Sequence, residues 1–352
     1  MESAIPAHLQ CPRTRHRRVA DDHVPPYPSF VARHAPGVTQ VVMAYFGVQH
    51  LEHAAAADAA LEDLATSFAA ERGPAHWDRS RYTDEAGYTN VICAAYWDDP
   101  ARFDAWFAAQ GAKWTREPRA GVGTFIELVR PDVRRYETLF SAPDRPEGIA
   151  TLAAGMSDMV IEHAYWGGAR DRIPASQTDA MQPAGAPRLV RDGGRVTVRP
   201  HENLCLIRSG QDWGDTQAEE RAMYQRDVEP VLRAGMDFLR DEGLSIGCFA
   251  NRYLSVETAD GHSIEKSYGM SWWKSLDALE RWAESHPTHV AIFGAAMKYL
   301  STLGPAAKLK LYHEVTVAHA DEQFFEYLNC HDRSGMLRCM PLNAPPGTSP
   351  GY

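Results

Sequence analysis

An internal repeat is the feature of this chain that most restricts how it can fold. The stretches "TNVICAAYWDDPARFDAWF" (residues 89–107) and "EKSYGMSWWKSLDALERWA" (residues 265–283) share one layout: an apolar, β-favouring run that ends in tryptophan, then a helix start, then a helix that carries a second tryptophan. Both pairs of tryptophans, 97 with 273 and 106 with 282, are separated by 176 positions (273 − 97 and 282 − 106). The chain is therefore predicted to contain two copies of one unit.

The flanking segments extend the repeat in both directions. Residues 40–49 match residues 202–211, and residues 123–131 match residues 309–317, all of them apolar strand candidates. Each half then reads strand, helix, strand, helix, strand. This order predicts an α+β fold of duplicated ferredoxin-like units, each with an antiparallel sheet and its helices on one face. Two such sheets facing each other would enclose an apolar ligand pocket.

The repeat also suggests how the chain is divided. We expect an N-terminal arm (1–37), a first ferredoxin-like repeat (38–135), an inserted connecting segment (136–200), a second ferredoxin-like repeat (201–320) and a C-terminal segment (321–352). The insertion is either functional or a loop packed under the sheet. Four arginines of the arm, at 13, 15, 17 and 18, are expected to lie in solvent rather than to form a docking patch.

Composition excludes several classes of protein. A net charge of −10 argues against a nucleic-acid or anionic-membrane partner, because such partners need a basic surface. No apolar run approaches the roughly 18 residues of a membrane span, and the first residues lack a signal-peptide core, so a cytoplasmic protein is expected. The six cysteines form no C-x-x-C pair, so the sequence signals neither a structural zinc site nor covalent haem attachment, and it favours buried free thiols.

Two histidines precede an amphipathic helix in "ESHPTHVAIFGAAMKYL" (residues 284–300), whose start Ser285 or Thr288 can cap. From His289 onward, apolar residues recur at helical spacing, so His289 lies on the buried stripe of the helix. His286 does not clearly share that stripe. A buried histidine bonded to a backbone carbonyl and a metal or haem ligand both fit His289.

Three further polar residues interrupt apolar patterns. In "KLKLYHEVTV" (residues 308–317) His313 shares a strand face with leucines and valines, where the first half has Ile126. Its role is either structural or proton transfer. Ser209 lies near the end of a strand, where its hydroxyl can reach a pocket, but no G-x-S-x-G motif marks it as a nucleophile. Arg172 in "RDRIP" is either a surface arginine or a group that binds an anion or a polar substrate.

Segments spread over nearly the whole chain resemble the haem-dependent aldoxime dehydratases, both the aliphatic and the phenylacetaldoxime type. They are "YETLF", "RDRIPASQTD", "ENLCLIRSGQDW", "GMDFLRDEG", "RWAESHPTH", "LKLYHEV" and "EYLNCH". The resemblance implies a lyase that converts aldoximes to nitriles and water. It also implies a homodimeric α/β-barrel-type haem fold of duplicated ferredoxin-like units, shared with dye-decolourising peroxidases and chlorite dismutases.

The resemblance further implies a role for each candidate residue. His289 looks like the axial ligand of a non-covalent, ferrous haem b. Ser209, Arg172 and His313 look like the catalytic residues, with His313 as acid and base, and Glu137 looks like the partner that orients or charges His313. A small-molecule aldoxime is then the expected partner.

Three alternatives stay open at the level of sequence. A peroxidase or chlorite-dismutase-like enzyme would use the same haem for oxygen chemistry, and a haem-binding or sensor protein would perform no chemistry. A zinc hydrolase built on His286, His289 and His331 has the least support, because no H-E-x-x-H motif or cysteine cluster accompanies these residues.

Overall fold

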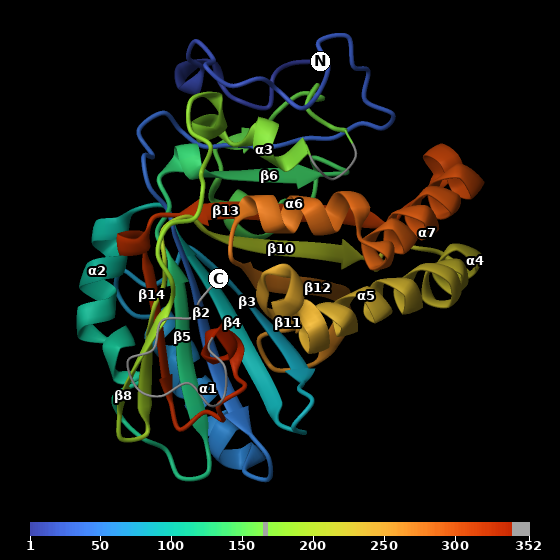
Figure 1. The fold of residues 1–352 in the computed structure, drawn as a ribbon. Helices are drawn as coiled ribbons and strands as arrows, with labels where there is room; N and C mark the ends of the chain where they lie inside the picture. Colours follow the sequence, from blue (N-terminus) through green and yellow to red (C-terminus); the bar gives the residue numbers. More distant parts are fainter. Residues whose placement is uncertain (165–167, 340–352) are drawn as a thin grey trace.

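The computed structural model describes residues 1–164 and 168–339. Two stretches lie outside the described residues: 165–167, within the expected insertion, and 340–352, the Pro- and Gly-rich end of the expected C-terminal segment. The fold is a mixed α/β arrangement in which a long antiparallel sheet carries helices on its outer faces (Figure 1).

Each half of the repeat contributes four strands in the same spatial order. In the first half the strands are β2 (Val42–His50), β3 (His76–Thr83), β4 (Thr89–Trp97) and β5 (Gly123–Val129). In the second half they are β10 (Leu204–Asp212), β11 (Cys248–Glu257), β12 (Ser263–Trp273) and β13 (Lys310–Ala318). The order is β3-β4-β2-β5 in one half and β11-β12-β10-β13 in the other, so the first strand of each half lies between its third and fourth.

Sequence reasoning missed one strand in each half, β3 and β11. Most side chains of β3 ("HWDRSRYT") are polar and half-buried, so the strand lacks the apolar run by which the others were found. These two strands pair with each other, through Ser255 with Arg81 and Glu257 with Arg79, and so connect the two halves edge to edge. The result is one twelve-stranded sheet.

The expected barrel is wrong, because within the described part of the chain the sheet does not close. Its two ends are β6 (Tyr136–Phe140), beside β13, and β8 (Arg188–Asp192), which pairs with β9 (Arg195–Arg199). Between β5 and β9 lies β14 (Gln323–Leu328), and a separate short pair joins β1 (Ala32–Arg33) to β7 (Gly155–Met156). The insertion thus supplies strands to both ends of the sheet.

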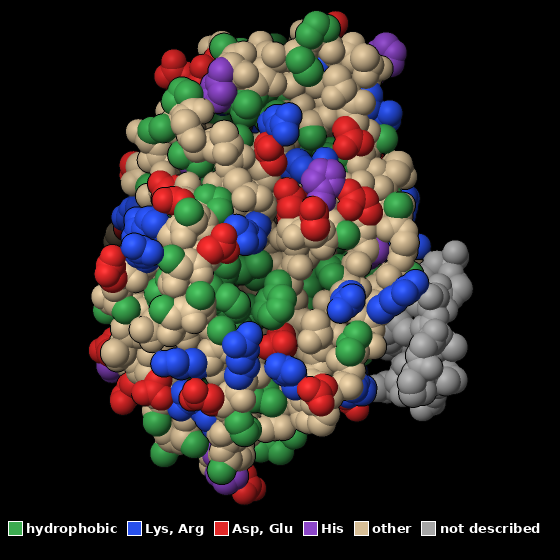
Figure 2. Space-filling model, turned by 90° about the vertical axis from the view of Figure 1, so that its left-hand side faces the viewer, with side chains coloured by type: hydrophobic (Ala, Val, Ile, Leu, Met, Phe, Trp, Pro, Cys, Tyr) green, Lys and Arg blue, Asp and Glu red, His purple; other side chains and the backbone are tan. Residues whose placement is uncertain are grey.

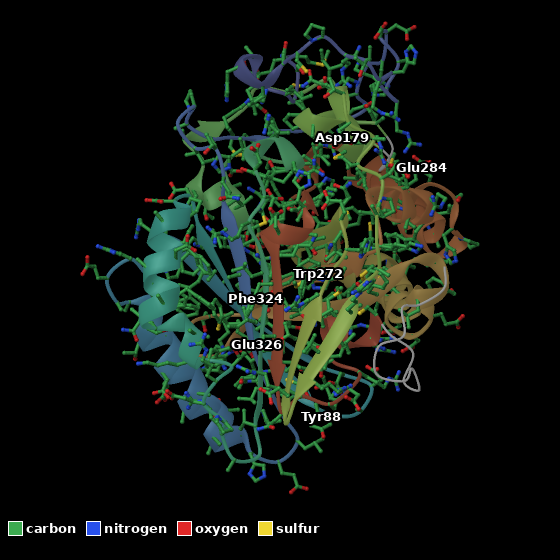
Figure 3. The ribbon with its side chains drawn as sticks, turned by 60° about the vertical axis from the view of Figure 1, so that its left-hand side comes forward. Tyr88, Asp179, Trp272, Glu284, Phe324 and Glu326 are labelled. Carbon is green, nitrogen blue, oxygen red and sulfur yellow. The ribbon has the colours of Figure 1, made fainter. Side chains whose placement is uncertain are left out.

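The sheet twists so that the strands of the second half run across those of the first (Figure 1), and the inner faces of the halves pack together. Trp272 of β12 lies at the centre of this contact (Figure 3), 4.8 Å from Phe325 and 6.3 Å from Tyr45 between ring centroids. The apolar space between the two halves of the sheet is therefore a filled core. The expectation of a ligand pocket there is wrong, because large aromatic side chains from both faces occupy it.

Helices cover the outer faces of the sheet. In the first half they are α1 (Ala54–Phe68) and α2 (Pro100–Ala109). In the second half they are α4 (Ala218–Met223), α5 (Glu229–Glu242), α6 (Leu276–Ser285) and α7 (Pro287–Leu303), with a short α3 (Ala169–Arg172) in the insertion. Among the described residues no helix has the length and apolar character of a membrane span. Figure 2 shows the side of the molecule near α2 and β8, where charges of both signs surround a hydrophobic area.

The N-terminal arm does not lie free in solvent, contrary to expectation. It covers the insertion at one end of the molecule (Figure 1). There Arg18 forms ion pairs with Glu280 and Glu284 of α6, and Arg17 pairs with Glu162. The prediction failed because these carboxylates lie far away in the sequence, so the charge pattern of the arm alone could not reveal them.

Candidate active site

A large pocket lies on the outer face of the second half, between the sheet and helices α5, α6 and α7. It has about 1160 Å³ of empty space, counting the part that opens to solvent. Its walls are mainly apolar, with Leu232 and Met236 from α5, Leu279 and Trp282 from α6, and Ile292 from α7. A space of this size and character suits a large, flat, apolar cofactor together with a small substrate.

His289 of α7 lines this pocket and is buried, with 6% of its surface exposed. Its ring lies 4.6 Å from the ring of Trp282, whose indole nitrogen donates to Thr288 at 3.0 Å and so connects α6 to the start of α7. Burial lowers the pKa of His289 to about 4, against a weaker opposite effect of a backbone hydrogen bond with Ala283. The imidazole is therefore neutral at physiological pH, the form in which histidine binds a metal.

His286 has a different position. It is the N-cap of α7, where its ring accepts from the backbone nitrogen of Thr288, and it stacks on Phe238 at 4.4 Å. The expectation that Ser285 or Thr288 caps this helix is wrong, although Pro287 does begin it. No group of three or more His, Cys, Asp or Glu side chains in the described chain could hold a metal ion, and His331 instead pairs with Asp84 at 2.9 Å.

Ser209 and His313 lie side by side on the floor of the same pocket. They are direct partners in the antiparallel pairing of β10 with β13, so their side chains leave the sheet on one face. In the first half the same register positions hold Phe46 and Ile126, which are partners in the pairing of β2 with β5. Ser209 is not at the end of its strand as expected, because β10 continues to Asp212.

Glu137 and Arg172 contact His313 from the side of β6, the strand next to β13 on the edge away from Ser209. The Nε2 atom of His313 lies 2.9 Å from Glu137 Oε1 and 3.0 Å from Arg172 Nη2. Arg172 Nε donates to the other Glu137 oxygen at 2.6 Å. Burial alone would raise the pKa of Glu137, but Arg172 and His313 hold it below its ordinary value, so this carboxyl is ionised.

This arrangement gives Nε2 of His313 a partner in either protonation state. With a proton, Nε2 can donate to the Glu137 carboxylate; without one, it can accept from the Arg172 guanidinium. A ring supported in both forms is suited to acting as an acid and then as a base.

Arg172 and Glu137 do not line the large pocket. Both line a smaller cavity beside the N-terminal arm, whereas His313 lines the pocket that contains His289. Arg172 Nη1 also donates to the backbone oxygen of Glu162 at 2.7 Å. The structure thus brings together four of the predicted residues, Ser209, His313, Glu137 and Arg172, with His289 across the same pocket, and places Arg172 against His313 but outside the lining of that pocket.

Sequence reasoning missed the small and polar residues next to Ser209. Gly269 of β12 is the other cross-strand partner of Ser209, and Ser271, Gln211 and Asn251 line the same pocket. Gln211 could have been found by alternation, because it lies two positions after Ser209 on one strand face. The others required the pairing of β10, β11 and β12, which no local pattern reveals.

Comparison with known proteins places these features in a family. The family model for haem-containing dehydratases matches residues 44–336. The aliphatic aldoxime dehydratase of Rhodococcus globerulus is 45% identical over 98% of this chain and 99% of its own length. That of Pseudomonas chlororaphis is 44% identical over 96% and 98%. The phenylacetaldoxime dehydratase of Bacillus sp. (strain OxB-1) is 32% identical over 91% and 94%.

Solved structures show the same similarity. A crystal structure of an aldoxime dehydratase in complex with butyraldoxime superposes with a TM-score of 0.91 at 44% identity, covering 96% of each chain. A second aldoxime dehydratase crystal structure gives the same score and identity, over 96% of this chain and 98% of that one.

Proposed function

The chain belongs to the family of haem-containing dehydratases, and we propose that it is an aldoxime dehydratase whose haem b is bound through His289. The reaction is R–CH=N–OH to R–C≡N and water. The observation that carries the proposal is one apolar pocket with a neutral imidazole on its helical wall and Ser209 beside His313 on its floor. These residues fit a haem that would be held through His289, with Ser209 and His313 as the polar groups available to a substrate in the same pocket.

When bound, ferrous haem iron supplies a site for the oxime nitrogen and electron density that weakens the N–O bond. The protein supplies the protons. Ser209 holds the oxime hydroxyl, and His313 in its protonated form delivers a proton to that oxygen, so the N–O bond breaks and water leaves. The neutral His313 then takes the hydrogen from the former aldehyde carbon, which completes the nitrile and restores the acid.

Glu137 and Arg172 have supporting roles in this scheme. The anionic Glu137 favours the charged imidazolium at the start of the cycle, and Arg172 favours the neutral ring after the proton has left. Because Arg172 contacts His313 rather than lining the large pocket, we assign it to His313 and not to the leaving hydroxyl.

The proposal also covers a duplicated unit within the chain, a homodimer and a cytoplasmic location. The equal strand order of the two halves supports a duplicated ferredoxin-like unit, with residues 201–320 as the haem-binding copy. A homodimer is supported by α7, a largely apolar helix in which only His289 and Tyr299 are fully buried, and by exposed Val290. A cytoplasmic location is supported by six free cysteines.

The test is an anaerobic assay of the purified protein. The absorption spectrum is recorded before and after dithionite, and nitrile is measured after an aldoxime is added. A haem spectrum with nitrile formed only in the reduced protein is expected. Oxidation of a dye by peroxide without any nitrile would identify a peroxidase instead, and a haem spectrum with neither product would identify a binding or sensor protein.

A further inference from the structure

The N-terminal arm is bound to the segment that carries Arg172. The carboxylate of Asp171, which is 1% exposed, accepts the backbone N–H groups of Arg18 and Val19 at 2.8 and 2.7 Å. Asp171 immediately precedes Arg172 in α3. The arm thus donates two backbone hydrogen bonds to the neighbour of a residue that contacts His313.

A second contact involves Glu162. Its buried carboxylate accepts the backbone N–H of Ala4 at 2.7 Å and the hydroxyl of Ser3 at 3.0 Å. Its own backbone oxygen accepts from Arg172 Nη1 at 2.7 Å. The arm therefore holds both the residue before Arg172 and the residue to which the Arg172 guanidinium is bonded.

A third contact lies just after Arg172 in the sequence. The side chain of Gln177 accepts the backbone N–H of Cys11 at 3.0 Å and donates to the backbone oxygen of Leu9 at 2.9 Å. The arm is also joined to α6, because Arg18 pairs with Glu280 and with Glu284, which is labelled in Figure 3. The side chains of Asp171, Glu162 and Gln177 are buried, and the arm bonds to them mainly through its backbone. The side chain of Glu284, in contrast, is partly exposed.

The segment around Arg172 needs such support. The helix α3 has four residues, fewer than a helix needs to be stable by itself in water. A long arginine side chain also loses up to about 2 kcal/mol of rotamer freedom when it is fixed. Contacts from outside the segment must therefore hold the guanidinium 3.0 Å from His313 Nε2.

From these contacts we propose that the N-terminal arm is part of the catalytic apparatus, with Asp171 as a positioning residue that holds Arg172 against His313. The inference rests on the proposed function. Displacing a catalytic group by about 1 Å can cost roughly 100-fold in rate, so loosening this attachment should slow nitrile formation without affecting His289 or haem binding.

The test compares Asp171→Ala, Asp171→Asn and Glu284→Gln as full-length, reduced proteins in single-turnover mixing with an aldoxime. Haem content and nitrile formation per haem are measured. Asp171→Ala should keep its haem and form nitrile roughly 10- to 100-fold more slowly. Asp171→Asn should recover most of the rate, because its amide oxygen can still accept both N–H groups. Glu284→Gln, which removes only the surface contact of Arg18, should behave like the wild type.

Val19→Pro serves as a second variant if Asp171→Ala loses its haem, since proline removes one of the two N–H donors and leaves Asp171 in place. The inference is wrong if the substitutions that keep haem turn over at the wild-type rate, or if the rate falls only in proportion to lost haem. Nitrile formation by the wild type tests the proposed function separately, since the inference concerns only the ratio of variant to wild type.

Discussion

At the scale of single residues, the site combines one neutral histidine with one histidine that has charged partners. His289 is buried among apolar side chains with its pKa lowered to about 4, whereas His313 lies between an anion and a cation. The first environment favours a metal ligand and the second favours proton transfer. Three predictions separate these roles.

His289→Ala should lose haem while the protein stays folded, because the substitution removes the proposed ligand from the mainly apolar helical wall of the pocket. His286→Ala is the matched control three positions away; it removes only a helix cap, which costs about 1 kcal/mol of stability. The measurement is haem per chain from the absorption spectrum, with circular dichroism to follow the fold. Equal haem content in the His289→Ala variant and the wild type would exclude His289 as the ligand.

Ser209→Ala and His313→Ala should both keep haem and still bind an aldoxime to reduced iron, because neither side chain is the ligand. Nitrile formation should fall on the order of 100-fold for Ser209→Ala, the usual cost of a lost preorganised hydrogen-bond donor. It should nearly stop for His313→Ala. Stopped-flow spectra report oxime binding while product analysis reports nitrile. If His313→Ala forms nitrile at the wild-type rate, His313 only lines the pocket and does not transfer the proton.

Glu137→Gln should change the acid side of the pH profile. Burial opposes the charge of Glu137, but Arg172 and His313 hold its pKa below the ordinary value, so the carboxylate stays charged until the pH falls through that lowered pKa. Under the proposed role, the wild-type rate should decline at low pH as Glu137 is protonated. The glutamine variant should be slower than the wild type at neutral pH and should lack this decline. Single-turnover rates against pH test this, and a variant with the wild-type rate and profile would show that Glu137 takes no part in the proton transfer.

At the scale of elements, α7 contacts α5 at a glycine. Gly235 of α5 faces Ile292 of α7, and a Cβ atom there would approach Ile292 Cδ1 to 2.5 Å. The glycine therefore leaves room for the end of the Ile292 side chain between the two helices. This close approach explains a glycine inside an otherwise helix-favouring segment, where it is normally unfavourable by about 1 kcal/mol.

Gly235→Val should displace the Ile292 side chain, which lines the pocket together with His289, and so weaken haem retention. Gly294→Ala is a matched control on α7, since a Cβ atom there meets nothing within 4 Å. That control should leave haem binding unchanged and raise stability by roughly 0.5–1 kcal/mol through helix propensity. Transfer of haem to an excess of apomyoglobin measures retention. Equal transfer rates for Gly235→Val and the wild type would show that haem retention does not depend on this contact.

At the scale of the whole molecule, one buried ion pair ties the two halves together. Arg252 of β11 donates twice to Glu127 of β5, at 2.6 Å each, and Glu127 also accepts from Trp272 and Tyr327. Burial opposes the charged Glu127 carboxylate, but Arg252 and these donors hold its pKa below its ordinary value. The pair therefore adds stability at neutral pH that is lost as pH falls.

Glu127→Gln should reduce the free energy of unfolding by about 3–5 kcal/mol at pH 7, because it leaves Arg252 charged and unpaired inside the protein. Asp104→Asn, which removes the carboxylate of the exposed pair with Arg130, should cost no more than about 1 kcal/mol. Urea unfolding at pH 7 and near pH 4 measures both. The difference in free energy of unfolding between the wild type and Glu127→Gln should be smaller at the lower pH. A difference that does not change with pH would contradict the link between the lowered pKa of Glu127 and stability.

Much of the site followed from local patterns. Helical spacing placed His289 on a buried stripe, and strand alternation placed His313 on an apolar face, both of which line the pocket. The roles of these residues, and of Ser209, Arg172 and Glu137, came from resemblance to a family. No local pattern could show that Glu137, Arg172 and His313 are neighbours, because they are contributed by three separate elements.

By itself the sequence determined three strands in each half, the helices between them and a repeated layout, because periodicity and turn chemistry act between residues close in the chain. Only the tertiary structure decided where the pocket lies, that the space between the sheets is filled and that the arm is attached to Asp171. Each of these depends on contacts between residues far apart in sequence, such as Tyr45 with Trp272 or Val19 with Asp171. The whole fold decides which residues far apart in the chain pack together or form hydrogen bonds, so a local sequence pattern does not predict these contacts.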